Sequence, residues 1–424
     1  MSRVLEPVAA APSAVPDVLR RLREALSGTG NAMLLHAPGT APAAALTPGE
    51  PLGPGEDDAA DPTVACVATS GSTGTGKGVL LHASALLASA SATHDRLGGG
   101  GRWLLALPLQ HVAGLQVLVR SLVAGTTPAV LDAADGFRPE AFAAAAARVI
   151  GPRRYTALVP TQVVRLLDAG GAALDALAGF DAVLVGGAAT APALCERATA
   201  AGVRLVTTYG MSETCGGCVY DGLPLDGVRV RLHGPEQRVL LGGPVLARGY
   251  RGRHVDDGSA DGGFFRDGAG RWFATDDAGS APGDLPATPA DAGDDVLAHG
   301  MLPGPEVLER LHVLGRLDDV VVTGGLKVAP APVESALLRL PGVAEAVVVG
   351  APDPQWGQRV VAAVVLRPGA GAPTLADVRR QVSADVAAHA TPRQLLVLDR
   401  MPLRGPGKPD RTALARLAAL GDRG

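Results

Sequence analysis

Short apolar runs that end near glycine alternate with helical segments, and this alternation limits the folds that the chain can adopt. The runs TVACVAT (63–69), AVLVGG (182–187) and VRLVTTYG (203–210) have the length and composition of buried strands. A helix between the last two begins near Pro192 and stops before Gly202, which are the positions that Pro and Gly favour. Strand–helix–strand order of this kind indicates a parallel sheet between helices. We therefore expect an α/β fold with doubly wound, mixed sheets.

The chain has 424 residues, which is more than one hydrophobic core usually supports. We expect a large N-terminal domain over 1–317 and a small, mobile α+β C-terminal domain over 318–424, with the boundary in the sequence GRLDD beside Asp318. The small domain is predicted to contain helices over 331–340, over 374–389 and from 410, and strands over 343–349, 359–366 and 394–399.

Several segments of the large domain have clear local signals. A helix is expected over 16–27, and a Pro/Gly/Ala-rich, poorly structured stretch follows over about 37–62. After the apolar run GVLL (78–81), Ser84 is expected to cap a helix. Residues 280–304 are predicted to form a flexible insertion.

Charge and composition exclude several classes of partner. A net charge of −4 and an aromatic content of 3 % argue against a nucleic-acid surface or an anionic membrane as the main partner. Four cysteines form no disulfide framework, and the CxxC pair of Cys215 and Cys218 lacks further metal ligands nearby. The N-terminus carries no signal-like apolar run, and the longest apolar window is interrupted by polar residues. We expect a cytoplasmic protein without stable membrane insertion.

The loop SGSTGTGK (70–77) contains the G-x-x-x-x-G-K pattern of a Walker A phosphate loop, read from Gly71. Two features argue against that motif: Gly78 replaces the expected Ser or Thr, and a strand rather than a helix follows Lys77. Backbone N–H groups beside glycines and several hydroxyls could still wrap a pyrophosphate. This composition favours a phosphate-binding hairpin loop over a glycine turn without a ligand.

The chain has only three lysines, and each lies within two residues of a glycine, in GTGKGV (Lys77), TGGLKV (Lys327) and GPGKPD (Lys408). The other basic residues, among 38 Lys plus Arg, are all arginines. Because an arginine does not replace a compact charge on a flexible stem, lysines that persist in such a chain indicate functional positions.

These segments together resemble the adenylate-forming superfamily, which includes acyl-CoA synthetases, luciferases and peptide-synthetase adenylation domains. The similarity runs from about residue 64 to 412, and the segments that carry it are TSGSTGTGKGV, GGAA (186–189), TTYGMSET (207–214), WFATDDAG (272–279), GRLDDVVVTGGLKVAPAPVE (315–334) and GPGKPDR (405–411). The resemblance implies an AMP-forming acid–CoA ligase that uses ATP, Mg²⁺ and coenzyme A, in which a carboxylate first becomes an acyl-adenylate and a thiol then takes the acyl group.

The resemblance also implies site residues. Lys408, Glu213 and His111 are the expected catalytic residues, with Glu213 also binding Mg²⁺, Thr214 touching phosphate, Tyr209 stacking on adenine, and Asp277 with Arg316 binding ribose. Asp276 stands where the family has Gly, which leaves the choice between Asp276 and Asp277 open. The expected contacts to ATP or AMP are Thr69, Ser70, Gly71, Ser72, Thr73, Gly74, Thr75, Lys77, Gly186, Gly187, Ala188, Thr208, Tyr209, Gly210, Met211, Ser212, Thr214, Asp277 and Arg316.

In the second half-reaction the resemblance makes Asp318 the hinge of the small domain, with Gly324, Gly325 and Lys327 near the path of the CoA thiol. Lys408 would reach the α-phosphate and the acyl carboxylate during adenylation.

The segment 107–125 is the most informative about which acid is bound. The resemblance implies that His111, in this segment, gates the acyl pocket and that Gly210 lines it. Arg120 lies in an apolar run, so its charge should meet an anion, either an internal carboxylate or a second carboxylate on the substrate. This segment resembles that of the o-succinylbenzoate–CoA ligases of menaquinone (vitamin K2) biosynthesis, whose substrate has two carboxylates.

Four alternatives stay open at this point. They are another acyl- or aryl-CoA synthetase, an adenylation enzyme that loads a carrier protein, a P-loop phosphotransferase and a binding module that has lost catalysis. The oligomeric state is also open, with a homodimer as one alternative.

Overall fold

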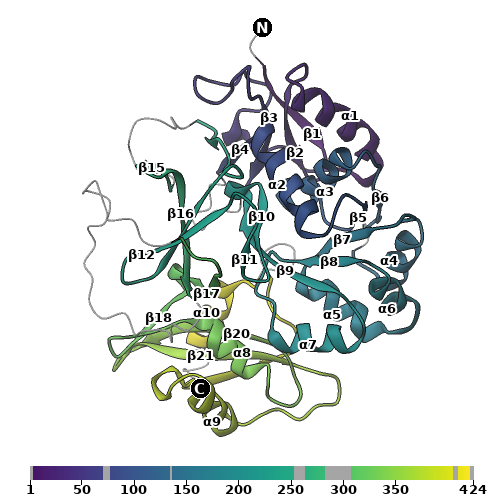
Figure 1. Ribbon diagram of the computed structural model, residues 1–424. Helices are drawn as coiled ribbons and strands as arrows, with labels where there is room; N and C mark the ends of the chain where they lie inside the picture. The colour runs from purple at the N-terminus through teal and green to yellow at the C-terminus, as the bar shows by residue number, and fades with distance from the viewer. Residues whose placement is uncertain are drawn as a thin grey trace.

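The computed structural model describes residues 3–69, 77–133, 136–252, 263–281, 307–403 and 409–420. Within these residues the strands form four sheets, and Figure 1 shows them packed side by side with helices around the second and fourth. The expected α/β class with mixed sheets is confirmed.

The first sheet has the strand order β1-β2-β3-β4-β14. Its strands are β1 (Leu5–Ala9), β2 (Ala32–His36), β3 (Thr63–Ala68), β4 (Gly78–His82) and β14 (Gly249–Tyr250). β1, β2 and β3 run parallel, whereas β3–β4 and β4–β14 are antiparallel. The predicted hairpin around the glycine-rich loop is therefore present, and the predicted first helix is α1 (Val15–Leu26), preceded by the 3-10 turn η1 (Pro12–Ala14).

The second sheet has seven strands in the order β11-β10-β9-β8-β7-β5-β6. These are β5 (Arg102–Leu105), β6 (Ala129–Val130), β7 (Arg154–Leu158), β8 (Ala182–Val185), β9 (Leu205–Met211), β10 (Gly216–Tyr220) and β11 (Leu223–Pro224). The five strands from β6 to β9 in this order are parallel, and β10 and β11 are antiparallel to their neighbours.

Helices cover both faces of the second sheet, as the alternating sequence predicts. They are α2 (Ala83–Arg96), α3 (Val112–Val123), α4 (Pro139–Ala146), α5 (Pro160–Ala169), α6 (Gly171–Ala178) and α7 (Pro192–Ala200). One core, which includes Leu86, Trp103 and Leu118, lies toward the first sheet, and a second core, which includes Phe142 and Leu166, lies on the other face.

The third sheet has the order β12-β13-β16-β15, with β17 paired to β16. Its strands are β12 (Arg229–His233), β13 (Arg238–Gly242), β15 (Phe264–Asp267), β16 (Gly270–Ser280) and β17 (His312–Arg316). Neighbouring strands in it are antiparallel. The flexible insertion expected over 280–304 begins at Ser280, the last residue of β16, and most of it lies outside the described residues.

The fourth sheet begins after the 3-10 turn η4 (Leu317–Asp319), and Figure 1 shows it at the lower end of the molecule. Its order is β19-β18-β21-β20, with β22 paired to β21. Its elements are β18 (Val321–Thr323), β19 (Leu326–Val328), β20 (Val343–Asp353), β21 (Gly357–Leu366), β22 (Gln394–Leu398), α8 (Pro330–Leu337), α9 (Leu375–Asp385), η5 (Ala388–Ala390) and α10 (Arg411–Leu420). Every helix and strand predicted here is present, and the hairpin β18–β19 is an addition.

The expectation that Ser84 caps α2 is wrong. The helix begins at Ala83, and its capping position is His82, whose side chain makes no capping hydrogen bond. Instead, the backbone N–H and the hydroxyl of Ser84 both donate to the carboxylate of Asp61, at 2.9 and 2.7 Å. The helix terminus is thus satisfied by an acidic side chain 23 residues earlier, a long-range contact that local sequence rules do not contain.

The Pro/Gly/Ala-rich stretch over 37–62 is mostly irregular, with one 3-10 turn, η2 (Ala44–Leu46), yet it is anchored to the core. Leu46 and Leu52 are buried, and Glu56 forms an ion pair with Arg251 in which the side chains are only 6 % and 7 % exposed. Glu56 also accepts hydrogen bonds from the N–H groups of Gly53 and Gly252, at 2.7 and 2.6 Å. This carboxylate therefore ties the irregular stretch to the segment just after β14.

Removing the Glu56 carboxylate should destabilise the fold strongly. In Glu56→Ala the buried Arg251 charge loses its only ion-pair partner among the described residues, and such a loss costs about 3–5 kcal/mol. Asp168→Ala is the matched control, because its ion pair with Arg197 is exposed and such pairs contribute about 0–1 kcal/mol. Thermal denaturation of both variants compares them, and equal Tm shifts would contradict the anchoring role.

Candidate active site

The glycine-rich loop connects β3 to β4, and the residues at its two ends, Thr69 and Lys77, are hydrogen-bonded to each other. The N–H and the hydroxyl of Thr69 both donate to the carbonyl of Lys77, at 2.8 and 3.2 Å, and so close the hairpin. A Cβ at Gly78 would lie 2.6 Å from Cys66 Sγ and 2.6 Å from Leu46 Cδ2. The Ser or Thr of a Walker A motif has no room here. The expected loop contacts at 70–76 lie outside the described residues.

Glu213 and Lys77 both lie beside Tyr250 at the edge of the first sheet. Glu213 lies in the 3-10 turn η3 (Ser212–Thr214), and its Oε1 accepts a hydrogen bond of 2.8 Å from the Tyr250 hydroxyl. The Lys77 ammonium lies 5.2 Å from the centre of the Tyr250 ring. Burial raises the pKa of Glu213, and the Tyr250 hydrogen bond and the Lys77 charge act in the opposite direction.

Tyr250 is a site residue that the sequence analysis missed. It lies in GGPVLARGY, a segment that carries no glycine-rich loop or charged pair of its own. The one signal in the sequence was the rarity of tyrosine, since the chain has only four and each is therefore a candidate for a specific role. Its place beside Glu213 follows from the pairing of β14 with β4, which joins residues about 170 positions apart.

Tyr209 and Asp277 bring the expected adenine and ribose contacts together. The Tyr209 hydroxyl donates to Asp277 Oδ2 at 2.8 Å, which connects β9 of the second sheet with β16 of the third. Burial raises the pKa of Asp277, whereas the Tyr209 hydrogen bond and the Arg316 charge lower it. Burial and the Asp277 charge raise the pKa of Tyr209 well above its ordinary value, so Tyr209 is a hydrogen-bond donor here.

The structure separates the two aspartates that the sequence left open. Asp277 pairs across the ladder with Arg316 of β17 and is directed to Tyr209. The Asp276 side chain is 59 % exposed and lies 3.4 Å from both Arg238 and Arg316. Neighbouring residues of a strand face opposite sides of its sheet, so Asp277 faces Tyr209 whereas Asp276 lies on the exposed side.

Two glycines of the expected nucleotide site are required by close approach of other backbone and side-chain atoms, and a third by its backbone conformation. A Cβ at Gly186 would lie 2.3 Å from Thr208 Oγ1 and 3.0 Å from the Thr208 carbonyl oxygen, and one at Gly210 would lie 2.1 Å from the Gly216 carbonyl. Gly187 follows with φ +79, a conformation that glycine adopts without strain. With Ala188, these residues leave β8 beside Thr208 on β9, where the Thr208 hydroxyl donates to the Val185 carbonyl at 3.2 Å.

Thr214 does not have the exposure that a phosphate contact requires. It is fully buried, and its hydroxyl donates to the Gly216 carbonyl at 2.8 Å and accepts from the Met211 N–H at 3.0 Å. The expectation of a phosphate contact is therefore corrected, because the hydroxyl closes the turn that carries Glu213. Met211 and Ser212 remain partly exposed beside it.

The expected hinge and thiol-path residues lie around η4 and the β18–β19 hairpin. Asp318 accepts an ion-pair contact from Arg316 at 2.8 Å. Gly324 and Gly325 have φ values of +58 and +79 and form a two-residue hairpin turn, the arrangement that favours two glycines. A Cβ at Gly324 would lie 2.5 Å from the Trp356 ring, and Lys327 is exposed on β19. Lys408 lies outside the described residues.

The family follows from comparison with known proteins. Residues 14–257 match the AMP-binding enzyme family, and residues 332–408 match the AMP-binding enzyme C-terminal domain. The chain belongs to the AMP-binding enzyme family.

Individual relatives of this AMP-binding enzyme act on different acids. A "Probable 2-succinylbenzoate–CoA ligase" of Mycobacterium tuberculosis is 45 % identical over 84 % of this chain and 85 % of its own length. A feruloyl-CoA synthase from Amycolatopsis is 30 % identical over 91 % of this chain and 79 % of its own. The o-succinylbenzoate coenzyme A synthetase of Bacillus subtilis, solved with ATP and a magnesium ion, is 27 % identical with a TM-score of 0.65, covering 84 % of this chain and 70 % of its own.

The acidic groups of this AMP-binding enzyme fit a magnesium ion that arrives with the nucleotide. Among the described residues, no three His, Cys, Asp or Glu side chains gather to form a metal site. Mg²⁺ commonly binds one or two carboxylates together with substrate phosphates and keeps several waters. Glu213, which lies close to the Lys77 end of the expected phosphate loop, fits that single-carboxylate arrangement.

His111 and Arg120 lie at opposite ends of α3. His111 is exposed at the N-terminal end of the helix, where its carbonyl accepts from the N–H groups of Gly114 and Leu115. Arg120 lies about 13 Å further along the helix axis. It is 3 % exposed, and its guanidinium donates to the Tyr220 hydroxyl at 3.2 Å and lies 5.2 Å from the centre of the Trp103 ring.

The expectation that Arg120 meets an anion is not met within the described part of the chain, where its partners are uncharged and its Nε has no partner. Burial lowers the pKa of Arg120. Because the side chain is enclosed in the core, it does not support the argument for a substrate with two carboxylates.

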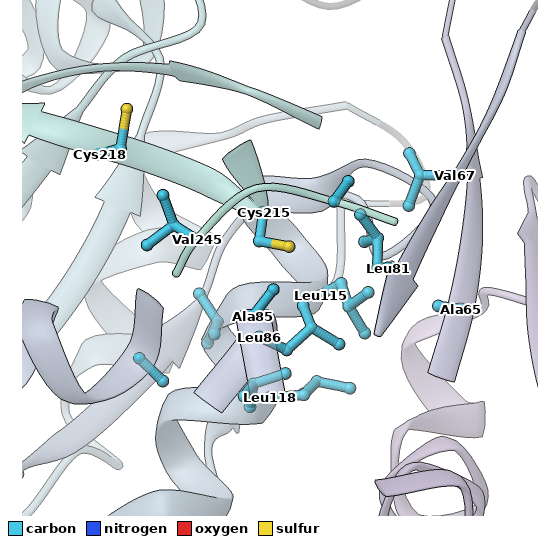
Figure 2. Close-up of a cluster of buried hydrophobic side chains, with 14 of the residues drawn as sticks. Ala65, Val67, Leu81, Ala85, Leu86, Leu115, Leu118, Cys215, Cys218 and Val245 are labelled. Carbon is cyan, nitrogen blue, oxygen red and sulfur yellow. The ribbon is translucent and has the colours of Figure 1, made fainter. Parts of the chain in front are cut away.

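Cys215 and Cys218 are core residues. Both are fully buried in one apolar cluster, and Figure 2 shows Cys215 near the labelled side chains of α2 and α3 and Cys218 nearer Val245, with their sulfur atoms pointing in different directions. Burial raises the pKa of Cys218 to about 12 and that of Cys215 further. Both thiols are therefore protonated and unreactive at neutral pH.

No helix in the described ranges is long and apolar enough to cross a bilayer.

The His94 side chain beside Arg120 should make the fold sensitive to acid. It is 5 % exposed, it accepts a hydrogen bond of 3.4 Å from the Trp103 indole N–H, and burial lowers its pKa from 6.5 to about 4. Because the folded pKa lies below the unfolded one, its stabilising contribution is complete above pH 6.5. That contribution is lost progressively as the pH falls from 6.5 towards about 4.

Thermal denaturation at pH 7.5 and pH 5.0 measures this effect. In His94→Gln the drop in Tm between the two pH values should be smaller than in the unmodified protein. His312→Gln, which alters an exposed histidine, serves as the control. An unchanged drop in His94→Gln would show that this imidazole does not cause the acid sensitivity.

Proposed function

We propose that this AMP-binding enzyme is an AMP-forming acid–CoA ligase that converts 2-succinylbenzoate, ATP and CoA to 2-succinylbenzoyl-CoA, AMP and diphosphate, a step of menaquinone biosynthesis. The observation that carries the choice of acid is the 45 % identity to the mycobacterial ligase over 84 % of the chain. Arg120 does not support the choice of this acid, because its side chain is buried in the core.

In the first half-reaction the acid's carboxylate attacks the α-phosphorus of ATP, and diphosphate leaves. This brings two anions together, so rigid positioning and positive charge provide most of the acceleration. Lys77 and the loop before it would hold the leaving phosphates, and Lys408 would place a compact charge at the α-phosphate. Mg²⁺, held by Glu213 and the phosphates, would neutralise further negative charge.

The nucleoside would be held where the second and third sheets meet. Tyr209 would contact the adenine ring, and Asp277 with Arg316 would bind the ribose hydroxyls. The Tyr209–Asp277 hydrogen bond of 2.8 Å supports this assignment, because it places the two expected contacts side by side. Gly186 and Gly187 would allow the backbone to approach the base closely.

In the second half-reaction the CoA thiol would attack the acyl carbon, and AMP would leave. Domains over 1–317 and 318–424, with a hinge at Asp318, would allow one site to serve both steps. The glycine turn at 324–325 and Lys327 would lie near the thiol, and His111 would gate the acyl pocket. A cytoplasmic location and a homodimeric assembly stay predictions.

A second candidate is an aryl-CoA synthetase for another acid, because the feruloyl-CoA synthase is 30 % identical over 91 % of the chain. Both candidates share the nucleotide residues and differ only in the acid. Purified enzyme with ATP, Mg²⁺ and CoA should therefore release diphosphate with 2-succinylbenzoate and much less with ferulate, benzoate or a medium-chain fatty acid. Release with ferulate alone would select the second candidate, and an acyl-adenylate that added CoA does not consume would favour a carrier-loading enzyme.

The two aspartates of β16 provide a paired test of the ribose site. Asp277→Asn should raise the Kd for ATP about tenfold, because hydrogen bonds to a charged group contribute about 1.5–3 kcal/mol. Asp276→Asn should change it less than twofold, since that side chain is 59 % exposed and directed away. Isothermal titration of ATP into both variants measures the difference, and a larger effect at Asp276 would reverse the assignment.

A further inference from the structure

We propose that Tyr250 is a positioning residue that aims the Glu213 carboxylate at the divalent cation of bound ATP and holds it apart from the Lys77 ammonium. This inference rests on the proposed function, because it concerns the same ATP site. It assigns a role to a segment, GGPVLARGY, that the sequence analysis left without one.

The first observation is the contact itself. Tyr250 is 5 % exposed, and its hydroxyl donates to one oxygen of the Glu213 carboxylate at 2.8 Å. The Lys77 ammonium lies 5.2 Å from the centre of the same ring. One side chain therefore contacts both the carboxylate expected to bind Mg²⁺ and the lysine at the end of the expected phosphate loop.

The second observation is that Glu213 and Lys77 form no ion pair within the described residues, although both lie against Tyr250. A direct pair would neutralise the two charges that are needed separately, one for the cation and one for phosphate. A phenol is a neutral donor, so it orients the carboxylate without cancelling its charge. Its ring face attracts the ammonium weakly, which leaves that charge available as well.

The third observation is that Tyr250 is rigidly held. Tyr250 pairs with Val79 in the β14–β4 ladder, and the flanking N–H groups of Arg248 and Arg251 donate to the carbonyls of Leu80 and Gly78, each at 2.8 Å. The Tyr250 ring meets the Phe264 ring edge-on, with centres 5.6 Å apart. A donor fixed on a strand defines the carboxylate direction better than one on a mobile loop does.

The fourth observation is that the same segment also holds the Glu213 backbone. The N–H of Ala247, three residues before Tyr250, donates to the Glu213 carbonyl at 2.8 Å. Main chain and side chain of Glu213 are thus both fixed from one stretch of sequence. The Glu213 backbone N–H also bonds to this carboxylate, so its direction is fixed from two sides.

The test measures cation-dependent ATP binding and does not depend on turnover. Tyr250→Phe keeps the ring over Lys77 and removes only the hydroxyl. Its Kd for ATP with Mg²⁺ should rise about tenfold, whereas its Kd for ATP in excess EDTA should match that of the unmodified enzyme. With Mn²⁺ in place of Mg²⁺, paramagnetic resonance should show the same weakening of the ternary complex.

Tyr155→Phe is the matched control. It also removes a tyrosine hydroxyl, which here donates to the backbone carbonyls of Leu97 and Gly99 at 3.1 Å. None of these residues belongs to the expected phosphate-binding segments. It should lower Tm without changing either Kd. If Tyr155→Phe and Tyr250→Phe shift the two Kd values alike, Tyr250 has only a structural role and the inference is wrong.

A double-mutant cycle separates an effect through Glu213 from a direct one. Glu213→Gln alone should remove the Mg²⁺-dependent part of ATP binding, and Tyr250→Phe added to it should cause no further loss. Additive losses would overturn the inference.

The proposed function can fail separately from this inference. If the unmodified enzyme binds no ATP with Mg²⁺, the ligase assignment fails. If it binds ATP normally and Tyr250→Phe binds equally well, only the role of Tyr250 is lost.

Discussion

The antiparallel pairing of β4 with β3 on one side and β14 on the other is the constraint on which the rest of the site depends. On one side β3 and β4 bring Thr69 and Lys77 together and so fix the two ends of the glycine-rich loop. On the other side β14 places Tyr250 beside Glu213. Main-chain hydrogen bonds in a buried ladder define these positions more firmly than side-chain contacts could, because every donor and acceptor there needs a partner.

Close backbone approach is the second physical theme, and it explains the glycines better than flexibility does. At Gly78, Gly186 and Gly210 a Cβ would lie within 2.6 Å of another atom. The resulting space allows strands β8, β9 and β10 to meet where the nucleotide is expected. The departure from the Walker A pattern at Gly78 therefore has a steric cause in the packing against Cys66 and Leu46.

The buried carboxylates of this chain have two different kinds of partner, arginines or tyrosine hydroxyls. Structural charges are buried with close partners, as Glu56 is with Arg251. The groups assigned to chemistry, Glu213 and Asp277, are instead held by tyrosine hydroxyls, which orient a carboxylate and leave its charge intact. Arg120 fits neither group, since it is buried with neutral partners, and nothing in the described contacts explains why a charge is kept there.

The sequence by itself determined the alternation of strands and helices, the phosphate-loop hairpin, the elements of the C-terminal unit and the family, because periodicity, glycine placement and short motifs are local properties. Tertiary structure decided the contact of Asp277 with Tyr209, the burial of Arg120 and Thr214, the capping of α2 by Asp61, and the place of Tyr250. Each of these depends on which face of a strand or helix meets a segment distant in sequence, and a single chain read in order contains no record of such contacts.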